Sequence, residues 1–146
     1  KATREIGWHP AIMGSDGLLA SVVSEYSDDV SLLEGIYAID FFASDDKGVQ
    51  KSSKSKKIAK LYGAHHKDEA TSYTALGVES YLVLHNAMNR CQAPDDRLCI
   101  NRMLRDTKNF EALIGNISIL ENGKANRPLI VNTIRDGVSR FVVKVY

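Results

Sequence analysis

Residues 35–42 read GIYAIDFF, a nearly continuous apolar run in which Asp40 is the one charged residue. Such a run is typical of a β-strand that is covered on both faces, as the strands of parallel sheets are. A shorter strand is expected at residues 11–13, between Pro10 and Gly14. Two such strands separated by a helix predict an α/β fold, with a parallel sheet flanked by helices.

The turn after the first strand reads GSDG, at residues 14–17. Ser15 or Asp16 is placed to cap the first amides of a following helix. That helix is expected because apolar residues recur at helical spacing: Leu18, Leu19, Val22 and Val23.

Residues 44–57 hold many of the lysines, and they allow two interpretations. One is a phosphate-binding stretch. The favoured one is the solvated face of a helix that ends at Gly63, because a sparse apolar stripe accompanies the lysines. His65 and His66 follow in a polar loop, where histidines are more often solvated than bound to a metal.

Two further helices are predicted after this basic segment, at residues 70–90 and 95–104. The second begins with Asp95 and Asp96 and is basic near its end, as the helix dipole favours. Turns at residues 122–123 and 136–137 then predict antiparallel hairpin strands over residues 117–119, 129–134 and 141–145. A doubly wound domain would keep alternating strand and helix, so we expect the chain to be part of a larger α/β protein.

The composition is that of an ordinary globular domain. Apolar residues make up 44% and charged residues 25% of the 146 residues, which is enough to build a core. The formal net charge of +1 is too balanced for a dedicated nucleic-acid-binding protein. No apolar run approaches the roughly 20 residues that span a bilayer. The chain begins at Lys1 without the apolar core of a secretion signal, and we expect further sequence upstream.

The two cysteines, Cys91 and Cys99, are eight residues apart, which suits neither a redox Cys-x-x-Cys pair nor a closed zinc site. A local disulfide is the favoured interpretation, and it would place the chain in an oxidising compartment. The alternative is two unpaired thiols at helix ends.

Three stretches of the chain together resemble one protein family. They are IMGSDGL at residues 12–18 with EGIY at residues 34–37, SYTALG at residues 72–77, and FEALIGNISILENG at residues 110–123. In this order and spacing they resemble the branched-chain amino-acid (Leu/Ile/Val) class of solute-binding proteins of ABC transporters. That family has the two-lobed periplasmic binding protein type I fold, with flavodoxin-like lobes.

The resemblance implies that the chain is the C-terminal part of a protein more than twice as long. Residues 1–39 would belong to the second lobe and residues 40–116 to the first. Residues 117–146 would form the hinge return and the C-terminal strands of the second lobe. The hinge would include segments near residues 39–42 and 115–119. A fragment of this kind is expected to associate with another chain or to exchange elements with it, because strand edges are otherwise exposed.

The function implied is that of a non-catalytic periplasmic or membrane-tethered component, which closes over a small amino-acid-like or carboxylated ligand and docks on a permease. No cofactor is implied. The sequence shows no nucleophile elbow, glycine-rich phosphate loop or metal spacing. The main alternative is a sensory module of the same fold, such as a receptor ectodomain. A further alternative is an enzyme that uses Asp28, Asp29 or the pair His65 and His66.

Asp16 is the principal site residue that the resemblance implies, because an acidic residue at this turn pairs with the ligand ammonium in amino-acid-binding relatives. The alternative is a helix cap. Ser15 and Gly17 would line the same turn. Tyr37 and Tyr73 would face the cleft, or else serve as ordinary packing aromatics.

Two residues depart from the pattern of the family. Asn116 replaces a common proline, and Leu120 replaces the usual acidic residue before Glu121. Both departures bear on the local hinge geometry.

Overall fold

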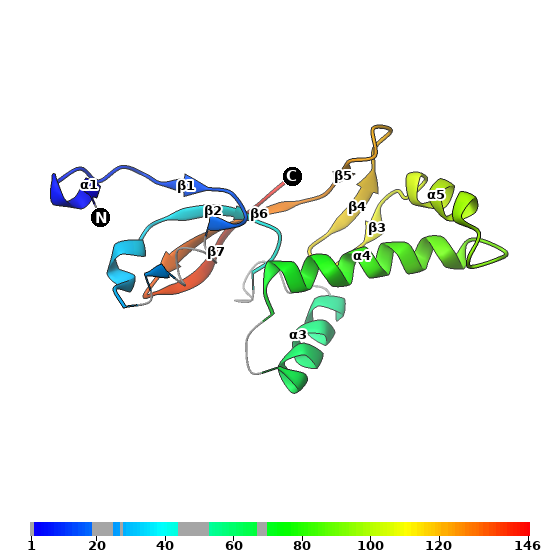
Figure 1. Cartoon of the computed structure of the whole chain (residues 1–146), viewed down its shortest axis with the longest axis horizontal. Helices are drawn as coiled ribbons and strands as arrows, with labels where there is room; N and C mark the ends of the chain where they lie inside the picture. Colours follow the sequence, from blue (N-terminus) through cyan, green and yellow to red (C-terminus); the bar gives the residue numbers. More distant parts are fainter. Residues whose placement is uncertain (1, 19–24, 27, 44–52, 67–69) are drawn as a thin grey trace.

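The computed structural model describes residues 2–18, 25–26, 28–43, 53–66 and 70–146. A four-stranded sheet forms one end of an elongated molecule (Figure 1). The sheet has the order β1-β2-β6-β7, and its strands are β1 (Met13–Gly14), β2 (Tyr37–Asp40), β6 (Leu129–Arg135) and β7 (Val138–Val145). β1 and β2 are parallel, whereas β6 is antiparallel to both β2 and β7. The predicted parallel pair and the C-terminal hairpin are therefore both confirmed.

Helices and a second sheet form the other end of the molecule (Figure 1). The helices are α3 (Ser53–His65), α4 (Ser72–Asn89) and α5 (Arg97–Arg105), and the strands are β3 (Phe110–Glu111), β4 (Asn116–Ile119) and β5 (Ala125–Asn126). The three strands pair in the order β3-β4-β5, and both pairings are antiparallel. A short helix α1 (Ala2–Glu5) and a 3-10 turn η1 (Val30–Leu33) belong to the four-stranded end.

Most predicted elements occur close to their expected bounds. α4 lies within residues 70–90, and α5 is capped by Asp96, whose carboxylate accepts from the amides of Leu98 and Cys99. The predicted end of α3 at Gly63 is wrong by two residues, because the helix continues to His65. Lys47, Lys51 and most of the helix expected after Gly17 lie outside the described residues.

The hairpin turns follow the expected glycines, but one of them leads to a different strand. Asp136 and Gly137 both have positive φ and connect β6 to β7. Gly123, also at positive φ, connects β4 to the short β5 rather than to β6. The chain returns to the four-stranded sheet only at Leu129, so residues 116–119 are part of the small sheet. The division of the chain into lobes stays a prediction.

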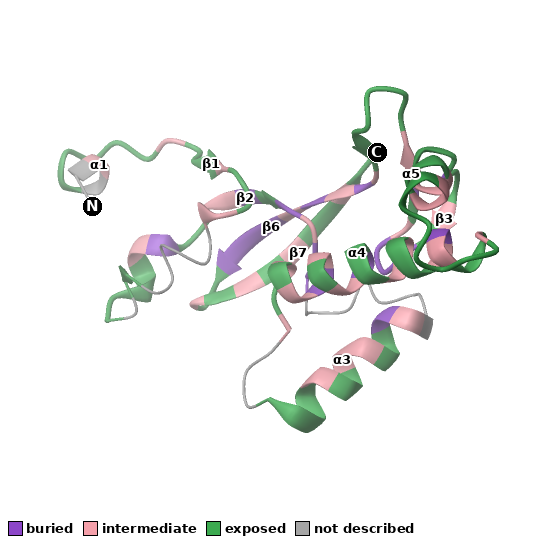
Figure 2. Ribbon diagram, turned by 45° about the vertical axis from the view of Figure 1, so that its right-hand side comes forward, coloured by how far each residue is buried: buried purple, intermediate pink, exposed green. Residues whose placement is uncertain are grey.

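Two groups of buried side chains hold these elements together. The larger lies where the chain leaves β2 and where α4 meets β6: Phe42, Ala43, Ala75, Leu113, Ile114 and Ile130. The smaller lies within the four-stranded end: Leu33, Ala38 and Ile134. Figure 2 shows that much of β6 is buried, since this strand takes part in both groups. Full burial of each large aliphatic side chain contributes roughly 1.5–3 kcal/mol.

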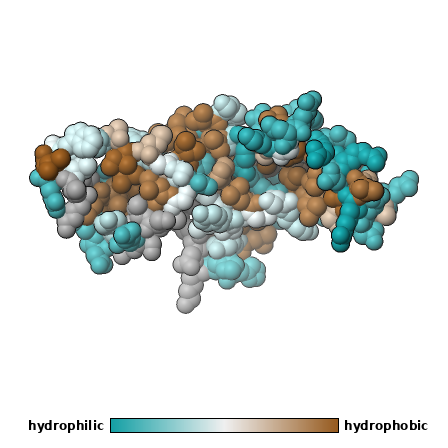
Figure 3. Space-filling model, turned by 45° about the horizontal axis from the view of Figure 1, so that its top comes forward, coloured by the Kyte–Doolittle hydropathy of each residue, from teal (hydrophilic) through white to brown (hydrophobic). Residues whose placement is uncertain are grey.

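The surface of the four-stranded end is notably apolar. Figure 3 shows apolar side chains over this end and more polar ones over the end that contains α5. Exposed large apolar residues at the first end include Ile6, Trp8, Ile12, Met13, Tyr26, Val30 and Ile39. Exposed apolar side chains that gather at one end of a molecule commonly mark an interaction site.

The predicted disulfide is confirmed. Cys91 and Cys99 are joined, with 6.0 Å between their Cα atoms, and the bond ties the end of α4 to the first turn of α5. The guanidinium of Arg90 adds a hydrogen bond of 3.1 Å to the carbonyl oxygen of Met103. The tip of the molecule is therefore cross-linked.

Candidate functional site

The carboxyl ends of the parallel strands β1 and β2 meet at one edge of the four-stranded sheet. Gly14 pairs with Ala38, so Asp16 and Asp40 each come two residues after the last pair. Open α/β sheets bind ligands in the crevice outside the carboxyl ends of their strands. This edge is therefore the place where a ligand site is expected.

The first turn of α4 lies against the same edge. A side-chain carbon added at Gly17 would be 3.9 Å from the hydroxyl oxygen of Tyr73. Thr71 caps the helix, and its side chain and that of Thr74 form a capping box. We refer to Ser15, Asp16, Gly17, Asp40, Ser72 and Tyr73 as the corner.

The exposed members of the corner are the ones that the sequence predicted. Ser15, Asp16 and Tyr73 are exposed, and Tyr73 retains 63% of its accessible surface. The structure therefore brings four predicted residues together: Ser15, Asp16, Gly17 and Tyr73. Tyr37 is different, because it begins β2 and alternation along the strand puts it on the face opposite Asp40.

Asp40 is the buried member of the corner, with 8% of its surface exposed. Its Oδ1 atom accepts from the Phe41 amide at 2.7 Å and from the Ser72 hydroxyl. Its Oδ2 atom accepts from Nδ2 of Asn132 at 3.4 Å. Burial raises the pKa of Asp40 and the nearby Asp16 carboxylate raises it further, although the three hydrogen bonds oppose the shift.

The segment that leaves β2 contacts the segment that enters β6. Asn132, which is 1% exposed, donates from Nδ2 to the carbonyl oxygen of Phe42 at 3.2 Å. The guanidinium of Arg127 lies over the Phe41 ring, 5.1 Å from its centroid. The two connections between the ends of the molecule are therefore packed against each other.

A buried ion pair fastens these connections to α4. Arg127 Nη1 lies 2.6 Å from Oε2 of Glu79, and the two side chains are 11% and 3% exposed. The other oxygen of Glu79 accepts from the Leu113 amide at 2.9 Å. One carboxylate on α4 thus holds both the chain after β3 and the chain before β6.

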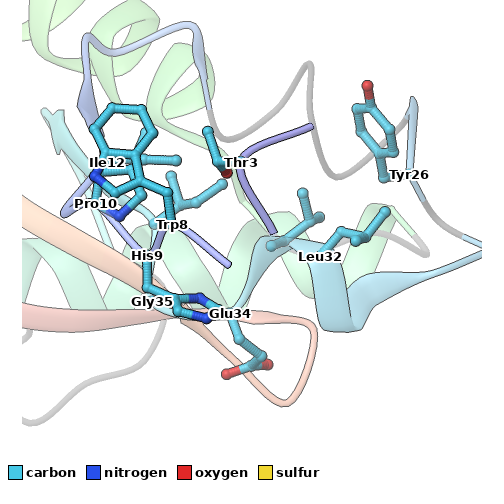
Figure 4. A pocket seen from close by; sticks show the side chains of 11 residues that line it. Thr3, Trp8, His9, Pro10, Ile12, Tyr26, Leu32, Glu34 and Gly35 are labelled. Atoms are coloured by element: carbon cyan, nitrogen blue, oxygen red, sulfur yellow. The ribbon is translucent and has the colours of Figure 1, made fainter. Parts of the chain in front are cut away.

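A separate hollow of about 220 Å³ lies at the opposite edge of the sheet (Figure 4). Trp8, Pro10 and Ile12 lie on one side of it, while Tyr26 and Leu32 lie on another. The residues that line it precede β1 and β2, at their amino ends. Because ligands of open α/β sheets bind at the carboxyl ends, the corner is the better candidate for a ligand site.

Within the described part of the chain, no group of three metal-ligating side chains is close enough to hold a metal ion. His65 and His66 are exposed, and His66 stacks on Tyr62 with 4.2 Å between the ring centroids. No helix among the described residues is long and apolar enough to cross a membrane.

No protein-family profile matches the chain, and no curated protein matches it significantly. Solved structures do match it. A leucine-binding protein, LivK, of Thermotoga maritima superposes with a TM-score of 0.82 and 26% identity, over 99% of this chain and 39% of that protein. The chain has part of the periplasmic binding protein type I fold.

Two further solved structures support this assignment of the fold. An ABC transporter substrate-binding protein of Desulfitobacterium hafniense has a TM-score of 0.79 at 16% identity, over 96% of this chain and 38% of that protein. The branched-chain amino-acid-binding protein LivJ of Streptococcus pneumoniae, in complex with isoleucine, has a TM-score of 0.73 at 23% identity, over 97% and 39%. The resemblance seen in the sequence is thus confirmed as a structural match to a non-catalytic family of solute-binding proteins. The chain spans 39% of the length of LivK and LivJ.

Sequence analysis missed the buried polar residues that hold the corner in place. Asp40 and Glu79 are charged residues within apolar stretches, and this mismatch is the feature of the sequence that could have indicated a buried polar role. Asn132 interrupts the apolar strand of residues 129–134 and gave the same signal, whereas Arg127 lies in a polar segment and gave none. Their roles depend on contacts across more than 45 positions of sequence.

Proposed function

We propose that the protein is the solute-binding component of an ABC importer, and that it binds a small amino-acid-like or carboxylated solute at the corner. The observation that carries the proposal is the position of Asp16, at the carboxyl end of a parallel strand and beside the first turn of α4. Relatives of this fold have been solved with leucine, isoleucine and benzoate.

Each exposed group of the corner suits one part of an amino acid. The Asp16 carboxylate would accept a charge-assisted hydrogen bond from an ammonium group. The first amides of α4 would favour a carboxylate, because helix N-termini attract anions. The Tyr73 hydroxyl can donate or accept, and its ring can cover an apolar side chain.

The two packed connections would serve as the hinge on which the lobes close. Closure over a ligand requires contacts with both lobes, so that the ligand selects the closed state. The closed form would dock on a membrane permease. The disulfide is consistent with a periplasmic or other extracytoplasmic location.

The exposed apolar surface of the four-stranded end supports a second part of the proposal. It would be covered by another chain or by exchanged elements, since a surface of this kind is a common interaction site. Size-exclusion chromatography with light scattering tests this. A monomer that binds no hydrophobic dye would contradict it.

Calorimetry tests solute binding directly. The full-length gene product that contains this chain is titrated with leucine, isoleucine and benzoate, beside the Asp16→Ala variant. We expect binding of at least one solute and a loss of about tenfold or more in affinity on substitution. Equal affinities of the two proteins would contradict the role of Asp16.

A further inference from the structure

We propose that Asp40 is a specificity-determining residue of the corner, whose negative charge favours solutes that carry an ammonium group over solutes that carry only a carboxylate. This inference rests on the proposed function, and it adds a residue that does not itself touch the solute. Under this inference, the charge of the site rather than its shape discriminates between amino acids and simple carboxylic acids.

The position of Asp40 is fixed on every side. Its carboxylate accepts from the Phe41 amide on its own chain segment, from Ser72 on α4 and from Asn132 on β6. With 8% of its surface exposed, it is the buried member of the corner and cannot turn out to solvent without breaking these contacts. Its carboxylate is therefore held at a fixed place between β2, α4 and β6.

Asp16 lies in the turn that follows β1, and Asp40 ends the adjacent parallel strand β2. Each lies two residues beyond the pair Gly14 and Ala38, and the Asp16 carboxylate raises the pKa of Asp40. Among the described residues, neither carboxylate forms an ion pair. Arg127, the cation that stacks on neighbouring Phe41, is already paired with Glu79. A cationic group of a solute would supply the missing counter-charge.

The same arrangement disfavours an acid that lacks an ammonium group. The buried Asp40 carboxylate adds to the repulsion that the exposed Asp16 exerts on an anion, because the effective dielectric constant around a buried charge is lower than that of water. A zwitterion compensates with its ammonium group. Asp40 thus contributes to discrimination through its field rather than through contact.

The test compares two solutes that differ only in the ammonium group, namely L-leucine and 4-methylpentanoate. For the full-length gene product, Asp40→Asn should lower the ratio of leucine affinity to 4-methylpentanoate affinity about tenfold. Asp95→Asn, at an exposed position in the disulfide loop, removes the same charge elsewhere and should leave the ratio unchanged. Ser72→Ala keeps the Asp40 charge and should also preserve the ratio, even where it weakens both solutes. An unchanged ratio in Asp40→Asn overturns the inference.

A second measurement needs no solute and separates the two proposals. Carbon-13 NMR titration of the Asp40 carboxyl should show its pKa falling in the Asp16→Asn variant, because a like charge has been removed. An unchanged pKa of Asp40 in this variant would show that the two carboxylates do not interact electrostatically. That result overturns the inference whether or not the protein binds leucine. If the coupling is present but the wild type binds neither solute, the proposed function fails for this solute class, and the specificity inference fails with it.

Discussion

The guanidinium of Arg127 forms a buried ion pair with the carboxylate of Glu79 on α4, with 2.6 Å between Nη1 and Oε2. Arg127 lies two residues before β6, whereas Glu79 also accepts from the amide of Leu113 after β3. One ion pair therefore determines how α4 sits on both connections.

Removal of Arg127 should be costly. Arg127→Met leaves the Glu79 carboxylate buried without its cation, which typically costs about 3–5 kcal/mol. We expect a loss of this size in the free energy of unfolding, measured by urea denaturation. Adding Glu79→Gln should recover part of it, because the amide oxygen can still accept from Leu113. A double variant that is no more stable than the single one would contradict this account.

The disulfide should stabilise the tip of the molecule. In the chain-entropy model, closing a loop of this length contributes about 2.6 kcal/mol. Cys91→Ser with Cys99→Ser should lower the free energy of unfolding by about this amount. Hydrogen exchange should increase mainly at the end of α4 and in α5. Faster exchange at the corner instead would mean that the cross-link acts over a longer range than the structure indicates.

Two glycines provide a matched pair of substitutions. A Cβ atom at Gly115 would lie 2.8 Å from Cγ of Pro128 and 3.0 Å from Nζ of Lys144. Since the proline ring cannot move aside easily, Gly115→Ala should destabilise the protein by roughly 1–3 kcal/mol. Gly77 is exposed in α4 with no neighbour within 4 Å, and Gly77→Ala should stabilise by roughly 1 kcal/mol. Thermal unfolding of both variants measures the contrast, and equal effects would refute it.

Asp40 should make stability depend on pH in a defined direction. Its pKa is raised from 3.8, so the folded protein holds the proton more tightly than the unfolded chain does. The resulting contribution to stability is complete below 3.8 and is lost as the pH rises through the folded pKa. Relative to Asp40→Asn, the wild type should therefore lose stability as the pH rises above 3.8 and through the folded pKa. Urea unfolding across this range, with Asp95→Asn as control, measures the difference; an opposite slope would contradict the assignment.

The elements that local sequence determines were predicted well. The Asp136 and Gly137 turn needs positive φ at both positions, and such pairs specify a hairpin through neighbouring residues alone. The cap at Asp96 is equally local. The family resemblance added the expectation that Asp16 and Tyr73 lie at a ligand site, which stays a prediction.

The pairing of segments that are far apart in the sequence could not be predicted from local patterns. β2 pairs with β6 across some 90 positions, and the pairing depends on which apolar surfaces can be buried together. The hydrogen bonds of Asp40 depend on that pairing, since Asn132 comes from β6. The ion pair of Arg127 likewise depends on how α4 lies against the return of the chain.

α4 starts at the corner and ends at the cross-linked tip, and it is 18 residues long. At 1.5 Å per residue it is a rod of about 27 Å, so a swing of about 10° at one end sweeps the other through about 5 Å. A fluorophore beside Leu98, whose side chain is 80% exposed, would magnify small rotations at the opposite end into a displacement large enough to follow in real time.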